Sequence, residues 1–340
     1  MKTFLPAASL VLAALLLGGC INLSPTYAPP PVADKMPVQY KEEDGWKTAT
    51  PMESLGRGPW WEMFGDPVLN DLVAKANTAN QNIAVAAANL RQARAQINVA
   101  RSAFLRGVSL PASATRSGSE GSPPQTQYSA GVSAQWEISF WNALPAFEAA
   151  RAQAEATAAD YAAMRLSVQS ELAQTYFQLR ILDVQHSLYE STIAAYAKAV
   201  QLTRSQYQGG MVTLTDVAQA ETQLASAEAQ LASIERQRAE LEHGIAILVG
   251  QIPSTFSLSK STLDARQPQV PTGLPSALLE RRPDIASAER LMAAANQQIG
   301  LARAAWFPSL SLSADRLAQG VGWHSAPLWT WSVGPSAALS

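Results

Sequence analysis

Two long helical runs separated by a glycine pair constrain the fold more than any other feature of the sequence. Apolar residues recur at alternating spacings of three and four over residues 168–207, and again over residues 217–248. This spacing keeps one narrow seam of each helix facing a partner helix, as in a coiled coil. At 1.5 Å per residue the first run extends roughly 100 Å. The sequence therefore predicts a long antiparallel helical hairpin over residues 142–250, with its tip at residues 208–213.

The predicted seam is defined by its residues. On the ascending helix these are Val168, Leu172, Thr175, Leu179, Leu182, His186, Tyr189, Ile193, Tyr196, Val200, Thr203 and Tyr207. On the descending helix they are Val217, Ala220, Leu224, Ala227, Leu231, Ile234, Arg238, Leu241, Ile245 and Leu248. The helices that carry this seam are rich in alanine and the seam is narrow, so we expect close packing in a tube or bundle rather than around a wide core.

Composition and motifs exclude several functional classes. The 340 residues carry a net charge of −2 and only 15% are charged, which argues against nucleic-acid binding. The single cysteine, Cys20, permits no disulfide within the chain and no cysteine metal cluster. No HExxH motif, phosphate-binding glycine loop or nucleophile elbow occurs. His186, His243 and His324 lie far apart, and we expect His186 to pack in the seam. We therefore expect neither an enzyme nor a cofactor nor a metal site.

The first residues are typical of a bacterial lipoprotein signal. Lys2 precedes an apolar run, and residues 17–20 read Leu-Gly-Gly-Cys. This resembles a lipobox, which predicts a signal peptide over residues 1–19 and lipid attachment, palmitate included, at Cys20. An ordinary signal with a chance cysteine is the alternative. Because Ile21 is not an acidic retention signal, we expect a lipid-anchored protein of the outer membrane, with most of the chain in the periplasm.

The segment before the helical hairpin predicts an extended stretch, a helix and two strands. Residues 20–65 are rich in proline, glycine and polar residues, so we expect them to be extended. Asp66 and Pro67 are suited to begin a helix over residues 66–107. Residues 108–141 alternate apolar and polar side chains, which fits either membrane β-barrel strands or a soluble hairpin. The lipidation signal favours the barrel.

The same pattern returns after the helical hairpin. A proline-rich linker spans residues 251–275, and then residues 276–307 predict a helix and residues 308–340 a second β-hairpin. Residues 97–110 align with residues 299–312, about 202 positions later. The chain is thus predicted to be a mainly α tandem repeat of helix, β-hairpin and long coiled-coil helices. The second copy stops where its own helical hairpin would begin.

Several motifs carry a family resemblance over essentially the whole chain. They are the lipobox and the runs WWEMFGDP (60–67), ANLRQARA (88–95), GLPS (273–276), ERRPDI (280–285) and ARAAWFP (302–308). In these the chain resembles the TolC/OprM family of outer-membrane efflux factors, in its lipoprotein, NodT-type branch. The resemblance implies a homotrimer with a 12-stranded outer-membrane β-barrel, four strands per protomer, above a periplasmic α-helical barrel. It also implies a passive exit duct for drugs or other small molecules. The implied partners are a periplasmic adaptor, an inner-membrane pump of the RND type and outer-membrane lipid.

Three departures from the family pattern leave a second function open. Arg106 stands where the second repeat has Pro308, and residues 140–143 lack the usual Phe-Gly-Arg corner between strand and helix. The second helical hairpin, with its half of the tunnel wall, is also missing. The alternative is therefore a truncated, non-conducting structural outer-membrane lipoprotein, or a fragment of such a channel.

The predicted functional residues lie at the hairpin tip. From the residues alone, the two glycines permit a tight reversal between antiparallel helices. The resemblance implies that the tip docks an adaptor, through Gly209, Gly210, Met211, Val212, Thr213 and Leu214. Asp216 lies in the first turn of the descending helix, where a carboxylate favours the helix dipole. By resemblance, Asp216 also becomes a candidate residue of the periplasmic gate.

Overall fold

The computed structural model describes most of the chain outside its first 57 residues. The described residues are 23–28, 58–105, 107–137, 140–262, 282–321 and 326–338. The predicted signal peptide, Cys20, Arg106 and residues 263–275 of the predicted linker lie outside these ranges. The chain divides into two compact units, residues 1–37, 89–159 and 284–340 in the first and residues 38–88 and 160–283 in the second. Among the described helices, none is both long enough and apolar enough to cross a membrane.

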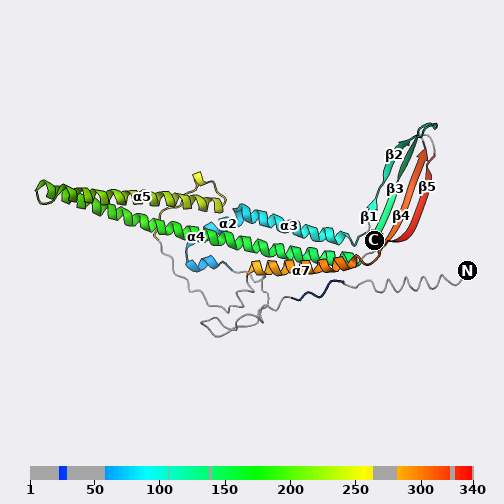
Figure 1. Ribbon diagram of the computed structural model, residues 1–340, viewed down its shortest axis with the longest axis horizontal. Helices are drawn as coiled ribbons and strands as arrows, with labels where there is room; N and C mark the ends of the chain where they lie inside the picture. Colours follow the sequence, from blue (N-terminus) through cyan, green and yellow to red (C-terminus); the bar gives the residue numbers. More distant parts are fainter. Residues whose placement is uncertain are drawn as a thin grey trace. The chain divides into compact units, whose positions relative to one another are not determined.

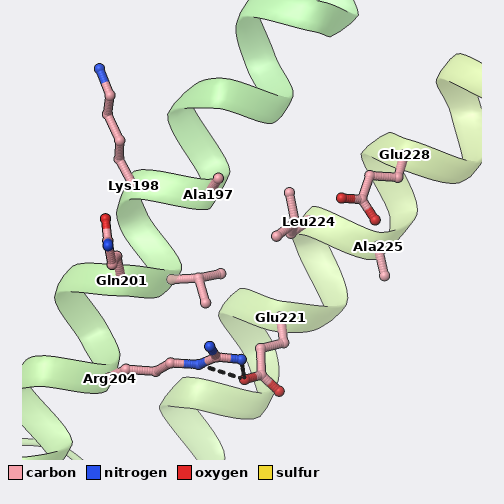
Figure 2. Close-up of a pocket in the computed structure, with 9 residues that line it drawn as sticks. Ala197, Lys198, Gln201, Arg204, Glu221, Leu224, Ala225 and Glu228 are labelled. Carbon is pink, nitrogen blue, oxygen red and sulfur yellow. Dashed lines mark hydrogen bonds and ion pairs between the residues drawn. The ribbon is translucent and has the colours of Figure 1, made fainter.

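The long helical hairpin of the second unit is confirmed. Helix α4 (Phe140–Gln208) and helix α5 (Leu214–Leu248) run antiparallel over the part of α4 that follows residue 160 (Figure 1). Every predicted seam residue is buried or half-buried except Tyr196 and Tyr207. Near the turn, Arg204 of α4 reaches across to Glu221 of α5 (Figure 2). The alternating spacing of three and four therefore sets which side of each helix faces the other.

The helix predicted over residues 66–107 is two helices, so a single helix was wrong. Helix α2 (Pro67–Ala79) and helix α3 (Gln81–Ser102) are separated by Asn80, which has an extended backbone with ψ at 127°. The Asn80 Oδ1 accepts hydrogen bonds from the backbone N–H groups of Asn82 (2.9 Å) and Ile83 (3.2 Å), which caps α3. Its Nδ2 donates to the carbonyl of Leu248 (2.8 Å) at the end of α5. A buried asparagine with all these partners favours a break over a continuous helix.

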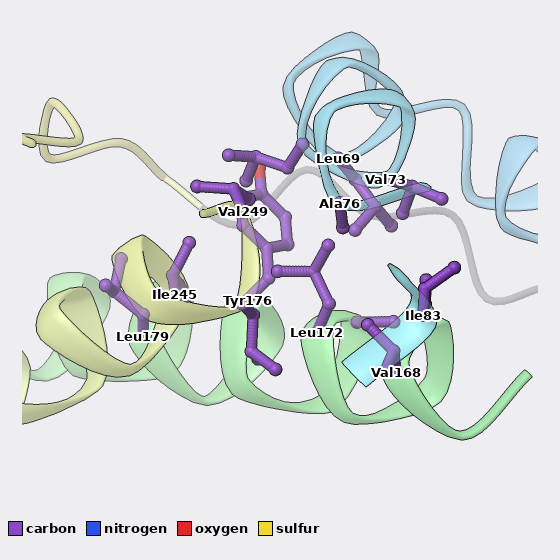
Figure 3. Close-up of a cluster of buried hydrophobic side chains, with 13 residues drawn as sticks. Leu69, Val73, Ala76, Ile83, Val168, Leu172, Tyr176, Leu179, Ile245 and Val249 are labelled. Atoms are coloured by element: carbon purple, nitrogen blue, oxygen red, sulfur yellow. The ribbon is translucent and has the colours of Figure 1, made fainter. Parts of the chain in front are cut away.

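One apolar core joins α2, the start of α3, α4 and α5 within the second unit. Figure 3 shows its side chains converging between these helices. Its buried members are Leu69, Leu72, Val73, Ala76, Ile83, Val168, Leu172, Ala173, Tyr176, Leu179, Ile245, Leu248 and Val249. The 3-10 helix η2 (Trp60–Phe64) packs its aromatic rings on the same cluster. Burial of this many apolar side chains is the main favourable term for the unit.

Asp66 has two roles at the edge of this core. As predicted, it caps α2, with its Oδ1 accepting from the backbone N–H groups of Val68 (2.8 Å) and Leu69 (3.1 Å). Its Oδ2 accepts a short hydrogen bond from the Tyr176 hydroxyl. Burial, and then this bond to Asp66, raise the pKa of Tyr176 to about 12. The tyrosine therefore remains a neutral donor at physiological pH and ties α4 to the start of α2.

A buried network of charges lies beside the core in the second unit. The carboxylate of Asp183 accepts from Arg180 (3.0 Å) and Arg238 (2.6 Å), and all three side chains are almost fully buried. The two guanidinium groups also donate to backbone carbonyls of Ser259 and Leu258 (2.7 and 2.6 Å). These carbonyls belong to the segment that follows the 3-10 helix η3 (Pro253–Thr255). The network fixes that segment to both helices of the hairpin.

The first unit contains one antiparallel sheet. Strand β3 pairs on one side with β1 and β2 and on the other with β4, which pairs with β5 at the edge. The strands are β1 (Gly107–Ser109), β2 (Ala112–Ser117), β3 (Gln125–Glu137), β4 (Ser309–Val321) and β5 (Leu328–Ala338). β1 and β2 continue in one register along β3, and Pro111, which lacks an N–H, interrupts them. They therefore act as one strand, which gives four strand positions per chain.

The tandem repeat is visible in the secondary structure. Helix α7 (Pro283–Ala304) begins and ends 202 positions after α3. Strand β4 likewise begins 202 positions after β1. The mainly α fold with paired β-hairpins is thus confirmed. The pairing of β3 with β4 joins the two repeats into a single sheet.

The two faces of this sheet differ in polarity. Residues that pair across neighbouring strands lie on the same face of a sheet. Ala114 pairs with Tyr128, and Trp136 pairs with Leu312, so the apolar residues of these strands lie on one face. The opposite face is rich in serine, where the hydroxyls of Ser113 and Ser129 lie 2.8 Å apart. Ser129, Gly131 and Ser133 of β3 lie on this second face. Such alternation is typical of a strand between lipid and water.

Candidate functional site

The predicted tip residues form a compact reversal that backbone groups hold together. Helix α4 ends at Gln208, and Gly210 two residues later lies in the left-handed region at φ 75°. The N–H of Met211 donates to the carbonyl of Gln206, and the N–H of Gly210 to the carbonyl of Tyr207, both at 2.9 Å. This pair of bonds is the Schellman motif, which satisfies the last carbonyls of a helix. Glycine suits the position because a side chain disfavours positive φ.

A capping box begins the descending helix on the other side of the turn. The Thr213 hydroxyl accepts from the backbone N–H of Asp216, while the carboxylate of Asp216 accepts from the backbone N–H of Thr213 (2.7 Å). The Thr213 hydroxyl also lies 2.6 Å from that carboxylate. The side-chain hydrogen bond, and then the backbone one, lower the pKa of Asp216. Asp216 therefore stays ionised to more acidic pH than a free aspartate, through contacts within its own helix end.

The side chains that the reversal does not use are exposed and apolar. Met211 is 72% exposed and Leu214 is 62% exposed, while Val212 is half-buried. The open space around Gly210 would accept a Cβ without contact. The predicted docking residues 209–214 thus lie together at the turn between α4 and α5, and we call these residues the tip. Two large apolar side chains held out on a rigid turn are suited to insertion into a partner's pocket.

Below the tip the two helices are tied by an ion pair that sequence reasoning missed. Arg204 donates through Nε (3.0 Å) and Nη2 (2.6 Å) to one carboxylate oxygen of Glu221. Figure 2 shows this pair at one end of a shallow hollow between α4 and α5, with Lys198 and Glu228 on its rim. The two residues are half exposed, so the pair orients the hairpin end more than it stabilises it. Finding this pair requires the register of the two helices, because Arg204 lies four residues before the end of α4 and Glu221 lies seven residues after the start of α5.

The histidines form no cluster in the part of the chain that the structure describes, where no group of three metal-ligating side chains occurs. His186 is buried, as its seam position predicted. Its Nε2 lies 3.1 Å from Glu235 and 2.8 Å from Lys260, so its surroundings are polar as well as packed. His243 is exposed, and His324 lies outside the described residues.

Comparison with known families gives one match over most of the chain. Residues 72–251 and 274–340 match the family model described as outer membrane efflux protein. The two matched segments contain both β-hairpins and the helical hairpin with its tip. All five strands of the sheet, and the two helices that flank the tip, therefore lie within the matched segments.

Individual relatives give the same result. The chain is 32% identical to the pyoverdine export outer membrane protein OpmQ of Pseudomonas aeruginosa, with 90% of this chain and 66% of the relative covered. It is 32% identical to the probable efflux pump outer membrane protein TtgC of Pseudomonas putida, with 90% and 65% covered. The solved outer-membrane channel OprN has a TM-score of 0.72 and 30% identity, with 88% of this chain and 72% of that chain covered. The chain therefore spans about two thirds of the length of these curated relatives.

Proposed function

Because this chain belongs to the outer membrane efflux protein family, we propose that it is the outer-membrane channel component of a tripartite efflux system. The observation that carries the proposal is the two-faced sheet, with an apolar face suited to lipid and a serine-rich face suited to a water-filled lumen. The channel is a passive exit duct for drugs or other small molecules. It needs no catalytic residue and no cofactor, because an inner-membrane pump of the RND type supplies the energy.

A closed barrel requires more strands than one chain supplies. Four strand positions per chain make twelve in a homotrimer, which removes the free edges at β1 and β5. A second observation on α4 supports the same assembly. Ile181, Leu188 and Leu202 lie at multiples of seven residues and are 46%, 61% and 61% exposed. An exposed apolar stripe with this spacing is suited to packing against a helix of the next protomer.

We place the protein in the outer membrane, with its helices in the periplasm and Cys20 as the lipid attachment site. The tip then points toward a periplasmic adaptor, which bridges to the pump. A gate role for Asp216 remains part of this proposal. Its carboxylate is exposed and charged, so it is available to a neighbouring protomer although Thr213 already accounts for its orientation.

Channel activity is tested by the oligomeric state and single-channel conductance of the purified chain in planar lipid bilayers. We expect a trimer that gives discrete conductance steps, and a leak that rises when Asp216 is replaced by Asn if Asp216 belongs to the gate. A protein that inserts into the bilayer as a trimer without conducting would instead support the alternative of a non-conducting structural lipoprotein.

Adaptor docking at the tip is tested by the double substitution Met211→Asp and Leu214→Asp. Burial of each of these side chains contributes about 1.5–3 kcal/mol, so we expect the affinity for a periplasmic adaptor of the same bacterium to fall at least about tenfold. Surface plasmon resonance with the immobilised trimer measures this affinity. Ile247→Asp is the matched control, because Ile247 is 66% exposed at the opposite end of α5. Equal affinities for the wild type and the double variant would exclude the tip as the docking surface.

A further inference from the structure

The apolar face of the sheet carries an uncompensated positive charge. In the described strands the charged residues on that face are Arg116 and Arg316, since Arg316 pairs with Val132 and Trp331. The carboxylates of the same strands, Glu137 and Asp315, lie on the opposite face. A charge on the lipid side of a barrel strand costs about 2–4 kcal/mol at the membrane midplane, and much less near the interface. Arg316 is therefore tolerated either if it lies near the membrane interface rather than at the midplane, or if an anion neutralises its charge.

The surroundings of Arg316 hold the guanidinium but leave it without a carboxylate. Its guanidinium carbon lies 5.2 Å from the centre of the Trp329 ring, a cation–π contact. The adjacent Asp315 is turned to the other face, where it accepts hydrogen bonds from Ser133 and Ser332. Within the described residues no ion pair involves Arg316, and its side chain is exposed. The five N–H donors of the guanidinium thus face outward without an acidic partner in the sheet.

The aromatic residues of this unit indicate the depth of Arg316. Where the helices meet the sheet, the rings of Trp141 and Phe307 lie 6.2 Å apart, and Trp306 is 85% exposed. Arg316 follows Phe307 by nine positions. At about 3.3 Å per residue and a tilt of about 40°, this corresponds to ~23 Å along the membrane normal.

That distance is close to the apolar band of about 25 Å that aromatic girdles flank in outer-membrane barrels. Trp329 and Trp331 are 60% and 79% exposed and lie at the level of Arg316, so they would form the second girdle. The helices connect to the sheet at the Phe307 end. In the proposed orientation Arg316 therefore lies at the outer interface, at the depth of the lipid headgroups.

We propose that Arg316, supported by Trp329, is a binding site for the phosphate of an anionic lipid in the outer leaflet. A guanidinium and a phosphate form paired, charge-assisted hydrogen bonds that fix orientation as well as charge. The tryptophan ring covers one face of the guanidinium and restricts its rotamers, while the adjacent apolar strand surface receives the acyl chains. The inference rests on the proposed function, because it needs the apolar face to contact lipid.

The test is native mass spectrometry of the purified full chain with diphosphoryl lipid A, and with the same lipid after its phosphates have been removed. We expect the wild type to retain diphosphoryl lipid A, and Arg316→Gln to bind it about tenfold more weakly, because a paired charge-assisted contact is lost. Arg316→Lys should recover only part of the affinity, since lysine keeps the charge without the planar fork. Arg151→Gln is the control, because Arg151 is an exposed arginine of the same unit that pairs with Glu155 on α4.

The remaining outcomes separate the two proposals. Insertion into lipid vesicles, measured by flotation, is scored first for the wild type and each variant. A wild type that does not insert overturns the proposed function and the lipid site with it. Normal insertion with equal lipid retention by the wild type and Arg316→Gln overturns only the lipid site. Loss of retention on addition of inorganic phosphate at matched concentration would show a free-anion site and also overturn it.

Discussion

Asp183→Ala is expected to lower the free energy of unfolding of the helical hairpin by about 3–5 kcal/mol. The substitution removes the carboxylate that Arg180 and Arg238 share. It leaves the almost fully buried guanidinium of Arg180 without a counter-ion, and that of Arg238 with only Glu242, at 3.3 Å. Their remaining bonds to the carbonyls of Ser259 and Leu258 satisfy hydrogen-bonding capacity but do not neutralise charge. Urea unfolding followed by helical circular dichroism measures the change.

Glu240→Ala is the matched control for Asp183→Ala. Glu240 also pairs with an arginine, Arg236, at 2.6 Å, but both side chains are more than 60% exposed. Exposed pairs of this kind contribute about 0–1 kcal/mol, so the control should unfold close to the wild type. If the two variants lost similar stability, the buried network would not be a major contribution to this unit.

Gly250→Ala should be the second most damaging change, and the molecule provides its own control. Helices α4 and α5 end in the same motif, with Gly210 at φ 75° and Gly250 at φ 71°. A Cβ at position 250 would lie 2.6 Å from the carbonyl oxygen of Ala79, whereas one at position 210 would meet nothing within 4 Å. We expect about 1–2 kcal/mol of conformational cost at both sites, and about 1–3 kcal/mol more at Gly250 from overpacking.

Thermal unfolding of Gly250→Ala and Gly210→Ala side by side separates the two contributions. The lower melting temperature should belong to Gly250→Ala, because only there must the end of α2 move. Equal melting temperatures would mean that the backbone near Ala79 adapts without cost, and that the contact between α5 and α2 is looser than its distances indicate.

Periodic features were the ones that the sequence predicted well. The seam, the alternating strands and the repeat all depend on spacing along the chain. The regular geometry of helices and strands determines which face each position occupies, so such spacing predicts the faces directly. The 202-residue offset then gave matching boundaries for α3 and α7. Similarly, Asp66 as a cap and the reversal at Gly210 follow from short-range rules that do not depend on tertiary contacts.

Features that depend on distant partners were missed. Arg238 was placed in the seam by its spacing alone, but its role comes from Asp183 and from a carbonyl 20 residues later in the chain. The break at Asn80 likewise depends on its bond to the end of α5, 168 positions away. No periodic pattern indicates the distant partners of Arg238 and Asn80. For the candidate site, the tip position was predictable, whereas the pair of Arg204 and Glu221 required the register of the two helices.

The reversal at the tip is held by main-chain hydrogen bonds, one glycine and the Thr213–Asp216 cap. The side chains of Met211 and Leu214 contribute little to that scaffold, because they extend into solvent. Mutations at these two positions can therefore accumulate without a folding penalty. Under the docking role proposed for the tip, related chains could therefore change the partner that they bind by exchange of a few side chains, while the hairpin stays unchanged.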